Sequence, residues 1–501
     1  MALSGVDITE ITNAMGVIPA TTGDTAAIIA PATAGALNIA AAFARGTSVA
    51  ANFTSGPLVE LASYLIGKPA VCVRSNATTV GGYGAIDNSG LDAGSTCVPA
   101  VDATTHPIDE YEVYIEIVHG GAIGNSDITY KWTLDDGRSA SSARINALGT
   151  GTSVNLTAYG VKVNLPSGTL TAGDVIRVRT TPPTEAVADL QAAEEALRVT
   201  SLNWDFVVLA TPVDSALFAE LDTWLASLHS VTKRFRAAMV NFRGPTLGET
   251  EAQYLAAAAA FRAANYSPYI TVGYHYCLTQ SKVSPGFQYR RPVAWPAARR
   301  AAVIKRPSRT DLGQVAGVDG GPLPSDVKLA DTNGNPLVDA SSGSLVHNEE
   351  LNPGGDDLHF LTLRTREGYS GAFIEKPWVF AADGSDIFLW QHRSLVNKVK
   401  KAVQTALTSR LRSPVLVDPT TGFILEEEAL DIENLVDAAV RAVVAGGPDV
   451  SAHKFTLHRD DPLLSSDAPA LNGDERIVPL AYPNNFGITI GFVNPAVGTV
   501  A

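Results

Sequence analysis

Charged residues are scarce in this sequence. Of 501 residues, 18% are charged, below the roughly 25% of an ordinary soluble domain. Acidic residues outnumber basic ones, 51 to 37, which gives a formal net charge of −14. This balance disfavours a protein that binds nucleic acid directly, because phosphate backbones attract the opposite charge. With 46% hydrophobic residues, the chain can build a large core or bury much of its surface against copies of itself.

Cysteine is also rare. Cys72, Cys97 and Cys277 are far apart and odd in number, so neither a disulfide framework nor a zinc site is predicted, and a reducing compartment is the default. No Lys or Arg precedes Arg45, so the basic start of a secretory signal is not expected. The uncharged stretch 25–44 is the longest candidate for a membrane span, but it is Ala-rich and broken by proline and glycine, which argues against insertion into a membrane.

Sequence signatures of active sites are incomplete wherever they begin. Gly67-Lys68 lacks the other residues of a phosphate-binding loop. The segment 331–335 resembles the start of a calcium loop, but Pro336 stands where the turn glycine belongs. His347 begins a His-Asn-Glu-Glu run without the second histidine of a zinc protease. We therefore predict no catalytic residue, no metal site and no cofactor.

An alternation of strands and helices runs from residue 200 to residue 275. Apolar runs at 206–210, 237–240 and 269–272 are separated by helical patterns at 217–228 and 249–264. Short apolar runs of this kind suit strands that are buried on both faces. The alternation predicts an α/β body with a doubly wound, mostly parallel sheet.

A different pattern occupies residues 101–183. Val113, Ile115 and Ile117 alternate with polar residues, and similar alternation returns at 128–132, 161–165 and 176–178. No helical period lies between these strands, so we predict a small β-sandwich inserted into the body.

The predicted domain organisation follows these changes of pattern. It comprises an N-terminal arm (1–25), an α/β body (26–100 and 184–390), the inserted β domain (101–183), a C-terminal inner domain with two helices (391–475) and a C-terminal arm strand (476–501). Phe486, Ile488, Ile490 and Phe492 alternate with glycine and threonine in that last strand, which lets another backbone approach its bare face.

Charge is segregated along the chain. Nine cations and no acid lie between residues 252 and 310, and six cations and no acid between 387 and 417. Two interpretations stay open: solvated basic faces, or faces that dock against acidic surfaces of neighbouring copies or of a partner. Nucleic acid is a weaker third option, because the second stretch lacks interleaved aromatic residues.

Several segments resemble tail sheath proteins of contractile-tailed bacteriophages. The segments are Arg290-Arg291-Pro292-Val293-Ala294-Trp295, 347–353, 361–365, 384–386, 130–137 and Gly173-Asp174. The resemblance implies a body with subtilisin-like topology but no protease triad, an outward β domain, and extended arms that add strands to neighbouring subunits. It also implies a structural subunit of the virion, made in the host cytoplasm, whose hexameric rings stack around an inner tail tube. Baseplate and tail terminator proteins would be further partners, and contraction would drive the tube through the host envelope.

The resemblance and the residue patterns together give the expected site residues. In the helix from Gln391 to Leu411, a stripe of Leu395, Val399, Val403 and Leu407 is expected to be buried. The residues expected to face an acidic tube are Arg393, Lys398, Lys400, Lys401 and Arg412.

The expected strand donors lie in the two arms: Val6, Ile8 and Ile11, and Phe486, Ile488, Ile490 and Phe492. Their expected acceptor is the strand around 450–457. Alternative functions are the sheath of a bacterial injection device or tailocin, an α/β enzyme, and a surface adhesin.

Overall fold

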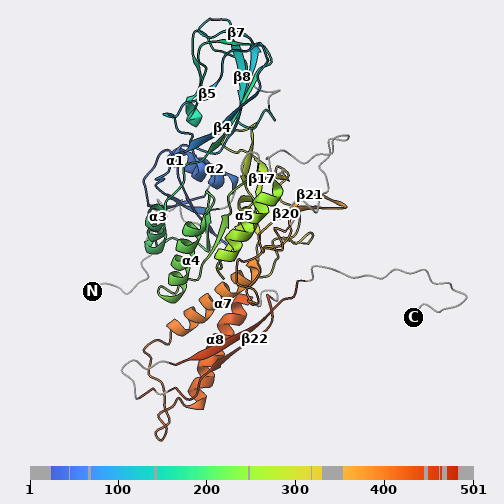
Figure 1. Cartoon of the computed structure of the whole chain (residues 1–501). Coiled ribbons are helices and arrows are strands. Elements are labelled where there is room, and N and C mark those ends of the chain that lie inside the picture. The colour runs from blue at the N-terminus through green and yellow to red at the C-terminus, as the bar shows by residue number, and fades with distance from the viewer. Residues whose placement is uncertain are drawn as a thin grey trace, which may run out of the picture. The chain divides into compact units, whose positions relative to one another are not determined.

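The computed structural model describes residues 24–44, 46–65, 69–139, 144–245, 249–317, 319–329, 354–444, 449–461, 463–464 and 471–482. The chain forms two compact units, Met1–Lys401 and Ala402–Ala501 (Figure 1). The predicted donor residues Val6, Ile8 and Ile11, and Phe486, Ile488, Ile490 and Phe492, lie outside the described residues. None of the helices in the described part is long and apolar enough to span a bilayer.

A six-stranded sheet forms the centre of the first unit. Its order is β16 (Ile270–Gly273), β15 (Ala237–Asn241), β14 (Phe206–Leu209), β1 (Ala26–Ala30), β3 (Ala70–Arg74) and β2 (Ala40–Phe43). All neighbours are parallel except β2, which runs antiparallel to β3 at one edge. β3 lies on one side of β1, and the later strands β14, β15 and β16 lie on its other side. Since every strand except β2 is parallel to its neighbours, the prediction of a mostly parallel α/β sheet is confirmed.

Helices cover both faces of this sheet. Ala26 and Ile28 of β1 pack in one core with α1 (Gly46–Phe53), α2 (Pro57–Tyr64) and α6 (Ala294–Val303). Ala27 and Ile29 pack in a second core with α3 (Val187–Val199), α4 (Ser215–Ser230) and α5 (Glu251–Ala264) (Figure 1). Both side-chain sets of a strand are therefore buried, which is why these strands are continuous apolar runs.

Capping residues and a first-turn proline mark where several of these helices begin. The Asp214 carboxylate accepts hydrogen bonds from the backbone N–H groups of Ala216 and Leu217 at 3.0 and 2.9 Å, which caps α4. Thr250 and Gln253 form a capping box at the start of α5. Pro57 occupies the first turn of α2, where its missing N–H costs nothing.

The inserted β domain is built from three sheets around one core. The largest pairs β4 (Gly82–Gly90), β13 (Val175–Thr181), β6 (Glu112–His119), β8 (Thr129–Thr133) and β9 (Asn146–Ala147). The second pairs β10 (Ser153–Leu156), β11 (Val161–Asn164) and β5 (Ala100–Val101), and the third pairs β12 (Thr169–Leu170) with β7 (Gly121–Ala122).

The β domain begins earlier than residue 101. β4, which the sequence-based division places in the body, pairs along its length with β13. Its sequence is rich in glycine and small polar residues and has no alternating pattern, so pairing with β13 rather than its own propensity makes it a strand. At the base of the domain, Thr79 and Thr184 exchange backbone hydrogen bonds of 3.2 and 2.9 Å.

Smaller sheets and a long helix complete the first unit. β17 (Tyr276–Gln280) pairs with β18 (Gln288–Pro292) and β19 (Lys328–Leu329), and β20 (Leu363–Arg366) pairs with β21 (Tyr369–Ile374). Helix α7 (Trp390–Thr408) then runs into the second unit, which contains α8 (Glu426–Val444), β22 (Val450–Leu457) and β23 (Gly473–Pro479). The predicted helix from Gln391 to Leu411 is confirmed to within about three residues at each end, and a second helix follows it as predicted.

The adjacent positions of Thr79 and Thr184 give a first testable prediction. Replacing residues 80–183 by two glycines should leave a soluble chain with an intact α/β body, because closing such a short gap costs little entropy. Removing the whole domain also exposes Arg290 and Arg291 to water instead of leaving them buried without the carboxylates of Glu110 and Asp109. Circular dichroism and gel filtration measure this outcome.

A matched deletion tests where the β domain begins. Replacing residues 101–183 leaves β4 without β13, and the exposed strand should make that variant aggregate. An insoluble 80–183 variant beside a soluble 101–183 variant would contradict the assignment of β4 to the β domain.

Candidate functional site

The buried stripe of α7 departs from the spacing expected from the sequence. Leu395 and Val399 are buried, as predicted, but Ala402 and Ala406 continue the stripe, while Val403 and Leu407 are half-buried. Residues spaced by exactly four move gradually around a helix that has 3.6 residues per turn. To stay on the buried face, the stripe therefore steps by three residues from Val399 to Ala402. The predicted stripe is therefore correct in its first half and wrong in its second.

The predicted basic residues of this helix occupy three different environments. Arg393 is buried at 2% exposure, with its guanidinium 5.4 Å from the ring centroid of Tyr269, and burial lowers its pKa to about 10. Lys401 forms an ion pair of 2.6 Å with Asp205, and Lys398 donates to the hydroxyl of Ser308 at 3.2 Å. These three residues thus make contacts inside the first unit.

Lys400 and Arg412 are exposed. The ammonium group of Lys400 lies 5.5 Å from the ring centroid of Phe235, and Arg412 has a left-handed backbone with φ of 60° just beyond α7. Contact of the basic residues with a tube stays a prediction.

The second unit carries a two-stranded antiparallel sheet. β22, the expected acceptor strand, pairs with β23 from Val450–Pro479 to Leu457–Gly473, and α8 packs against β22 (Figure 1). Phe455 and Leu457 are buried, as are Ile432 and Val436 of α8. Most other side chains of the two strands are exposed or half-buried. Within the described part of the unit, each strand has one edge that no other strand occupies.

Charged groups attach this sheet to α8. The Arg459 guanidinium pairs with Glu426 at 2.9 Å and also with Glu433, and the Glu433 carboxylate accepts from the Leu457 backbone N–H at 2.7 Å. These hydrogen bonds from Arg459 lower the pKa of both carboxylates. The pairs fix the end of β22 against the first turns of α8.

Several polar groups at the carboxyl ends of the body strands form hydrogen bonds with the fold itself, whereas both ring nitrogens of the buried His275 lack a partner among the described residues. Open α/β sheets commonly bind ligands at this edge. The buried Glu185 carboxylate accepts from Ser75 at 2.8 Å and Thr211 at 2.5 Å, which joins β3 to β14, and burial raises its pKa.

Asn241 and His275 lie at the same edge. The Asn241 amide donates to the carbonyls of Phe242 and His275, while its oxygen accepts from the Ala294 N–H. Burial lowers the pKa of His275 to about 4, so its ring is neutral. Within the described ranges, no three His, Cys, Asp or Glu side chains are grouped as ligands for a metal ion.

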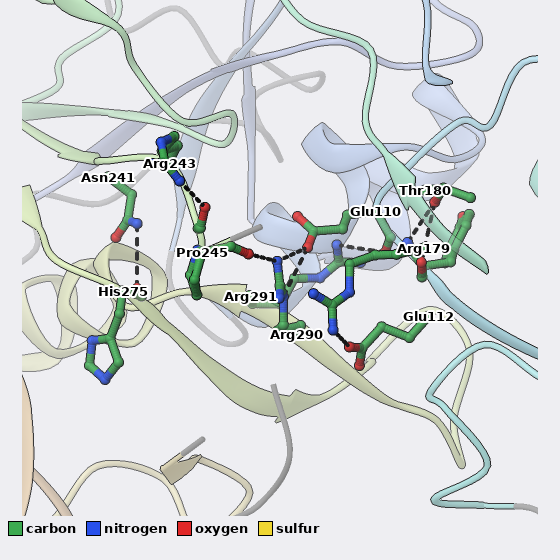
Figure 2. Close-up of polar contacts among 12 residues, drawn as sticks. Glu110, Glu112, Arg179, Thr180, Asn241, Arg243, Pro245, His275, Arg290 and Arg291 are labelled. Carbon is green, nitrogen blue, oxygen red and sulfur yellow. Dashed lines mark hydrogen bonds and ion pairs between the residues drawn. The ribbon is translucent and has the colours of Figure 1, made fainter. Parts of the chain in front are cut away.

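A buried ionic cluster joins the β domain to the body. The Arg291 guanidinium of β18 makes two hydrogen bonds with the Asp109 carboxylate, at 2.7 and 2.9 Å, and both side chains are 3% exposed. Arg290 pairs with Glu110 at 3.0 Å, and within the β domain Arg179 pairs with Glu112 at 2.8 Å (Figure 2). Burial opposes the charge of Arg291, but the attraction of Asp109 and then Glu60 outweighs it and raises the arginine pKa.

This cluster explains part of the segregation of basic residues in the sequence. Two cations of the acid-free stretch 252–310, Arg290 and Arg291, are buried rather than on a solvated face. They meet acids of the same chain that precede them by about 180 residues. Sequence reasoning missed the cluster; the adjacent acids Asp109 and Glu110, just before a strand, were the available signal.

Comparison with known proteins places the chain in a family. A family model described as "DUF2586, N-terminal domain" matches residues 3–278, more than half of the chain. The chain belongs to the DUF2586 family. The DUF2586 match contains all six strands of the body sheet and the whole β domain, and it ends before Arg290 and Arg291. No curated protein sequence matches the chain.

Two solved structures are similar to this DUF2586 chain. One is the sheath tail protein Lin1278 from Listeria innocua, with 11% identity and a TM-score of 0.43, covering 93% of this chain and 97% of that one. The other is a sheath tail protein from Desulfitobacterium hafniense, with 9% identity and a TM-score of 0.44, covering 95% of this chain and 100% of that one.

The ionic cluster of this DUF2586 chain gives a second prediction. Arg291→Met leaves the Asp109 carboxylate buried without its partner and should lower the free energy of unfolding by about 3–5 kcal/mol. Urea denaturation followed by tryptophan fluorescence measures the loss.

Two further variants separate the ion pair from general packing. Arg291→Met combined with Asp109→Leu removes both charges and should recover a large part of the lost stability. Arg198→Ala removes one partner of the exposed pair with Glu195 and should leave the midpoint unchanged. Equal losses in the single and the double variant would show that the buried charge is not what destabilises the protein.

Proposed function

We propose that this chain is a structural subunit of a contractile tail sheath. Its copies assemble as stacked hexameric rings around an inner tail tube, between a baseplate and a tail terminator. Contraction then drives the tube through the envelope of the host cell. The protein is part of a virion, has no catalytic role, and has an α/β body of subtilisin-like topology without a triad. The same subunit role in a bacterial injection device or tailocin is the alternative.

The two-stranded sheet of the second unit is the observation that carries this proposal. A two-stranded sheet is marginally stable in water and gains from additional strands. β22 and β23 have most side chains outside the core, and each has an edge free of other described strands. Such edges are templates for an extended segment from another chain. We propose that the two arms, with Val6–Ile11 and Phe486–Phe492, supply these strands to neighbouring subunits.

The segments that carry the sheath resemblance also support a structural role. Arg290 and Arg291 of the first segment are the buried cations that bind the β domain to the body. Thr133 and Asp135, in the segment 130–137, are completely buried, and the Asp135 carboxylate accepts from the Gln288 N–H at 3.1 Å. The shared residues thus fix how the β domain is attached, as a subunit that transmits force between copies requires.

A bistable packing of such subunits explains contraction in physical terms. Arms that stay paired with neighbouring sheets act as hinges, so subunits rotate and slide without separating. The contracted arrangement has the lower free energy, and a barrier holds the extended one. A difference of about 1–3 kcal/mol per subunit, repeated over many rings, is sufficient for a cooperative transition.

Removing an arm tests the strand-donation step. Deleting residues 484–501, or residues 1–20, should give folded monomers that form no tubes, because the acceptor sheet stays two-stranded. Negative-stain electron microscopy and gel filtration separate tubes from monomers.

A matched pair of variants distinguishes strand pairing from mere length of the arm. Changing Phe486, Ile488, Ile490 and Phe492 together to serine should abolish tubes, whereas changing them to valine preserves β propensity and should retain them. Normal tubes from the serine variant would refute donation by the C-terminal arm.

A charge reversal tests the tube contact. Lys400→Glu with Arg412→Glu changes two exposed cations and should prevent assembly around an acidic tube while the subunit keeps its stability. Arg144→Glu, at an exposed arginine of the β domain, is the control. Co-sedimentation of sheath with tube measures the effect, and unchanged co-sedimentation of the double variant would remove these residues from the interface.

A further inference from the structure

A polar cavity of about 330 Å³ lies at the amino-terminal ends of three body strands. Asp24, Asp205 and Ala237 stand at or just before the starts of β1, β14 and β15, and all line it. Its other walls come from the segment after α6 and from α7. The remaining lining residues are Asn203, Phe206, Lys305, Pro307, Ser308, Trp390, Ser394, Asn397, Lys398 and Lys401.

Two buried polar atoms of the lining have no hydrogen-bond partner among the described residues. They are the indole Nε1 of Trp390, a residue 1% exposed, and the amide Oδ1 of Asn397, a residue 6% exposed. Buried indole N–H groups are normally paired. Four of them lack a partner among the described residues, at Trp204, Trp224, Trp295 and Trp390, and of these only Trp390 lines the cavity. A bound group with an oxygen acceptor would satisfy Trp390, and the Asn397 amide offers a donor when it is turned around.

The described residues that line the cavity carry more positive than negative charges. Lys305, Lys398 and Lys401 line it together with two acids, Asp24 and Asp205. Asp205 is already engaged, since it accepts from Lys401 at 2.6 Å and from the Thr25 backbone N–H at 2.9 Å. Lys305 is exposed and also lines a second cavity of about 330 Å³ with Arg306, Arg309 and one acid, Asp319. An anion that approaches this region therefore meets cations from both cavities.

Asp24 makes that excess depend on pH. Burial, and then the nearby charge of Asp205, raise the pKa of Asp24 to about 7, although Lys401, Ser394 and Lys398 of α7 oppose the shift. Arg236, just before β15, is the further charged group near this pair. As pH falls through 7, Asp24 loses its negative charge and the cavity becomes more positive.

We propose that this cavity is a binding site for a small oxyanion, with Lys305, Lys398 and the Trp390 N–H as its main contacts. The ligand is a sulfate, a phosphate or a carboxylate group. The positive excess attracts the anion, the unpartnered N–H of Trp390 donates a hydrogen bond to one of its oxygens, and the neutral form of Asp24 removes the main repulsion. This inference concerns a single subunit and is independent of the proposed sheath function.

Sulfate is the probe that tests the site, because it keeps its charge between pH 6 and pH 8, whereas phosphate titrates near 6. Isothermal titration calorimetry of the full chain with sulfate at low salt should show saturable binding to one site. The affinity should be about tenfold higher at pH 6 than at pH 8, because a shift of one pKa unit in Asp24 on sulfate binding corresponds to a tenfold change in affinity. A heat signal that does not saturate with added sulfate, or an equal affinity at the two pH values, would overturn the proposal.

Four variants locate the binding. Lys305→Gln should weaken it about tenfold, and Trp390→Phe several-fold while it keeps the ring packing on Phe206. Asp24→Asn should bind at pH 8 as tightly as the unchanged chain at pH 6. Lys233→Gln, whose exposed lysine does not line the cavity, is the control. Equal affinity in the Lys305 and Lys233 variants would place the sulfate elsewhere and refute the site.

A second arm of the experiment separates the two sources of the oxyanion. If the natural ligand is a carboxylate of another copy, sulfate should inhibit association of subunits in the unchanged chain, and Lys305→Gln should show the same defect without sulfate. If the ligand is a free oxyanion, sulfate binds and association is unchanged. If the unchanged chain does not associate even without sulfate, the sheath function is contradicted. The sulfate titration of the monomer then still tests the anion site by itself.

Discussion

The parallel sheet of the first unit has to be covered on both faces, and most of the structure follows from this constraint. Its central strands carry apolar side chains on both sides, so each face needs its own layer of helices. Polar groups can then reach the sheet only at the two ends of the strands. At the carboxyl ends, Glu185 and Asn241 form hydrogen bonds with other groups of the same chain. At the amino ends they surround an open cavity.

The attachment of the β domain depends on charge rather than on apolar contact alone. Asp109 and Glu110 enter the body and meet two arginines of β18 in a region nearly free of water. A buried ion pair adds little net stability compared with apolar residues of the same size, but it is very costly to break. It also requires particular groups at particular angles, so it restricts the orientation of the domain.

The second unit contrasts with the first in how much it buries. α8 and β22 share a small core, while β23 is largely exposed. Helix α7 connects the units, and its basic residues serve several purposes: Arg393 packs within the first unit, Lys401 neutralises Asp205, and Lys400 faces solvent. A run of cations in a sequence is thus not one surface, because successive residues of a helix point in different directions.

The sequence by itself determined the elements whose pattern is local. Apolar runs such as 206–209 are strands, the helices between them begin at capping residues, and the alternation of Val113, Ile115 and Ile117 marks a half-buried strand. Only the tertiary structure decided that β4 belongs to the β domain, that Arg290 and Arg291 are buried, and that Trp390 and Lys398 share a cavity with Asp24. Periodicity reports which side of an element is apolar, but pairing, ionic contacts and cavities join residues that are tens to hundreds of positions apart. Their partners become known only when the chain is folded.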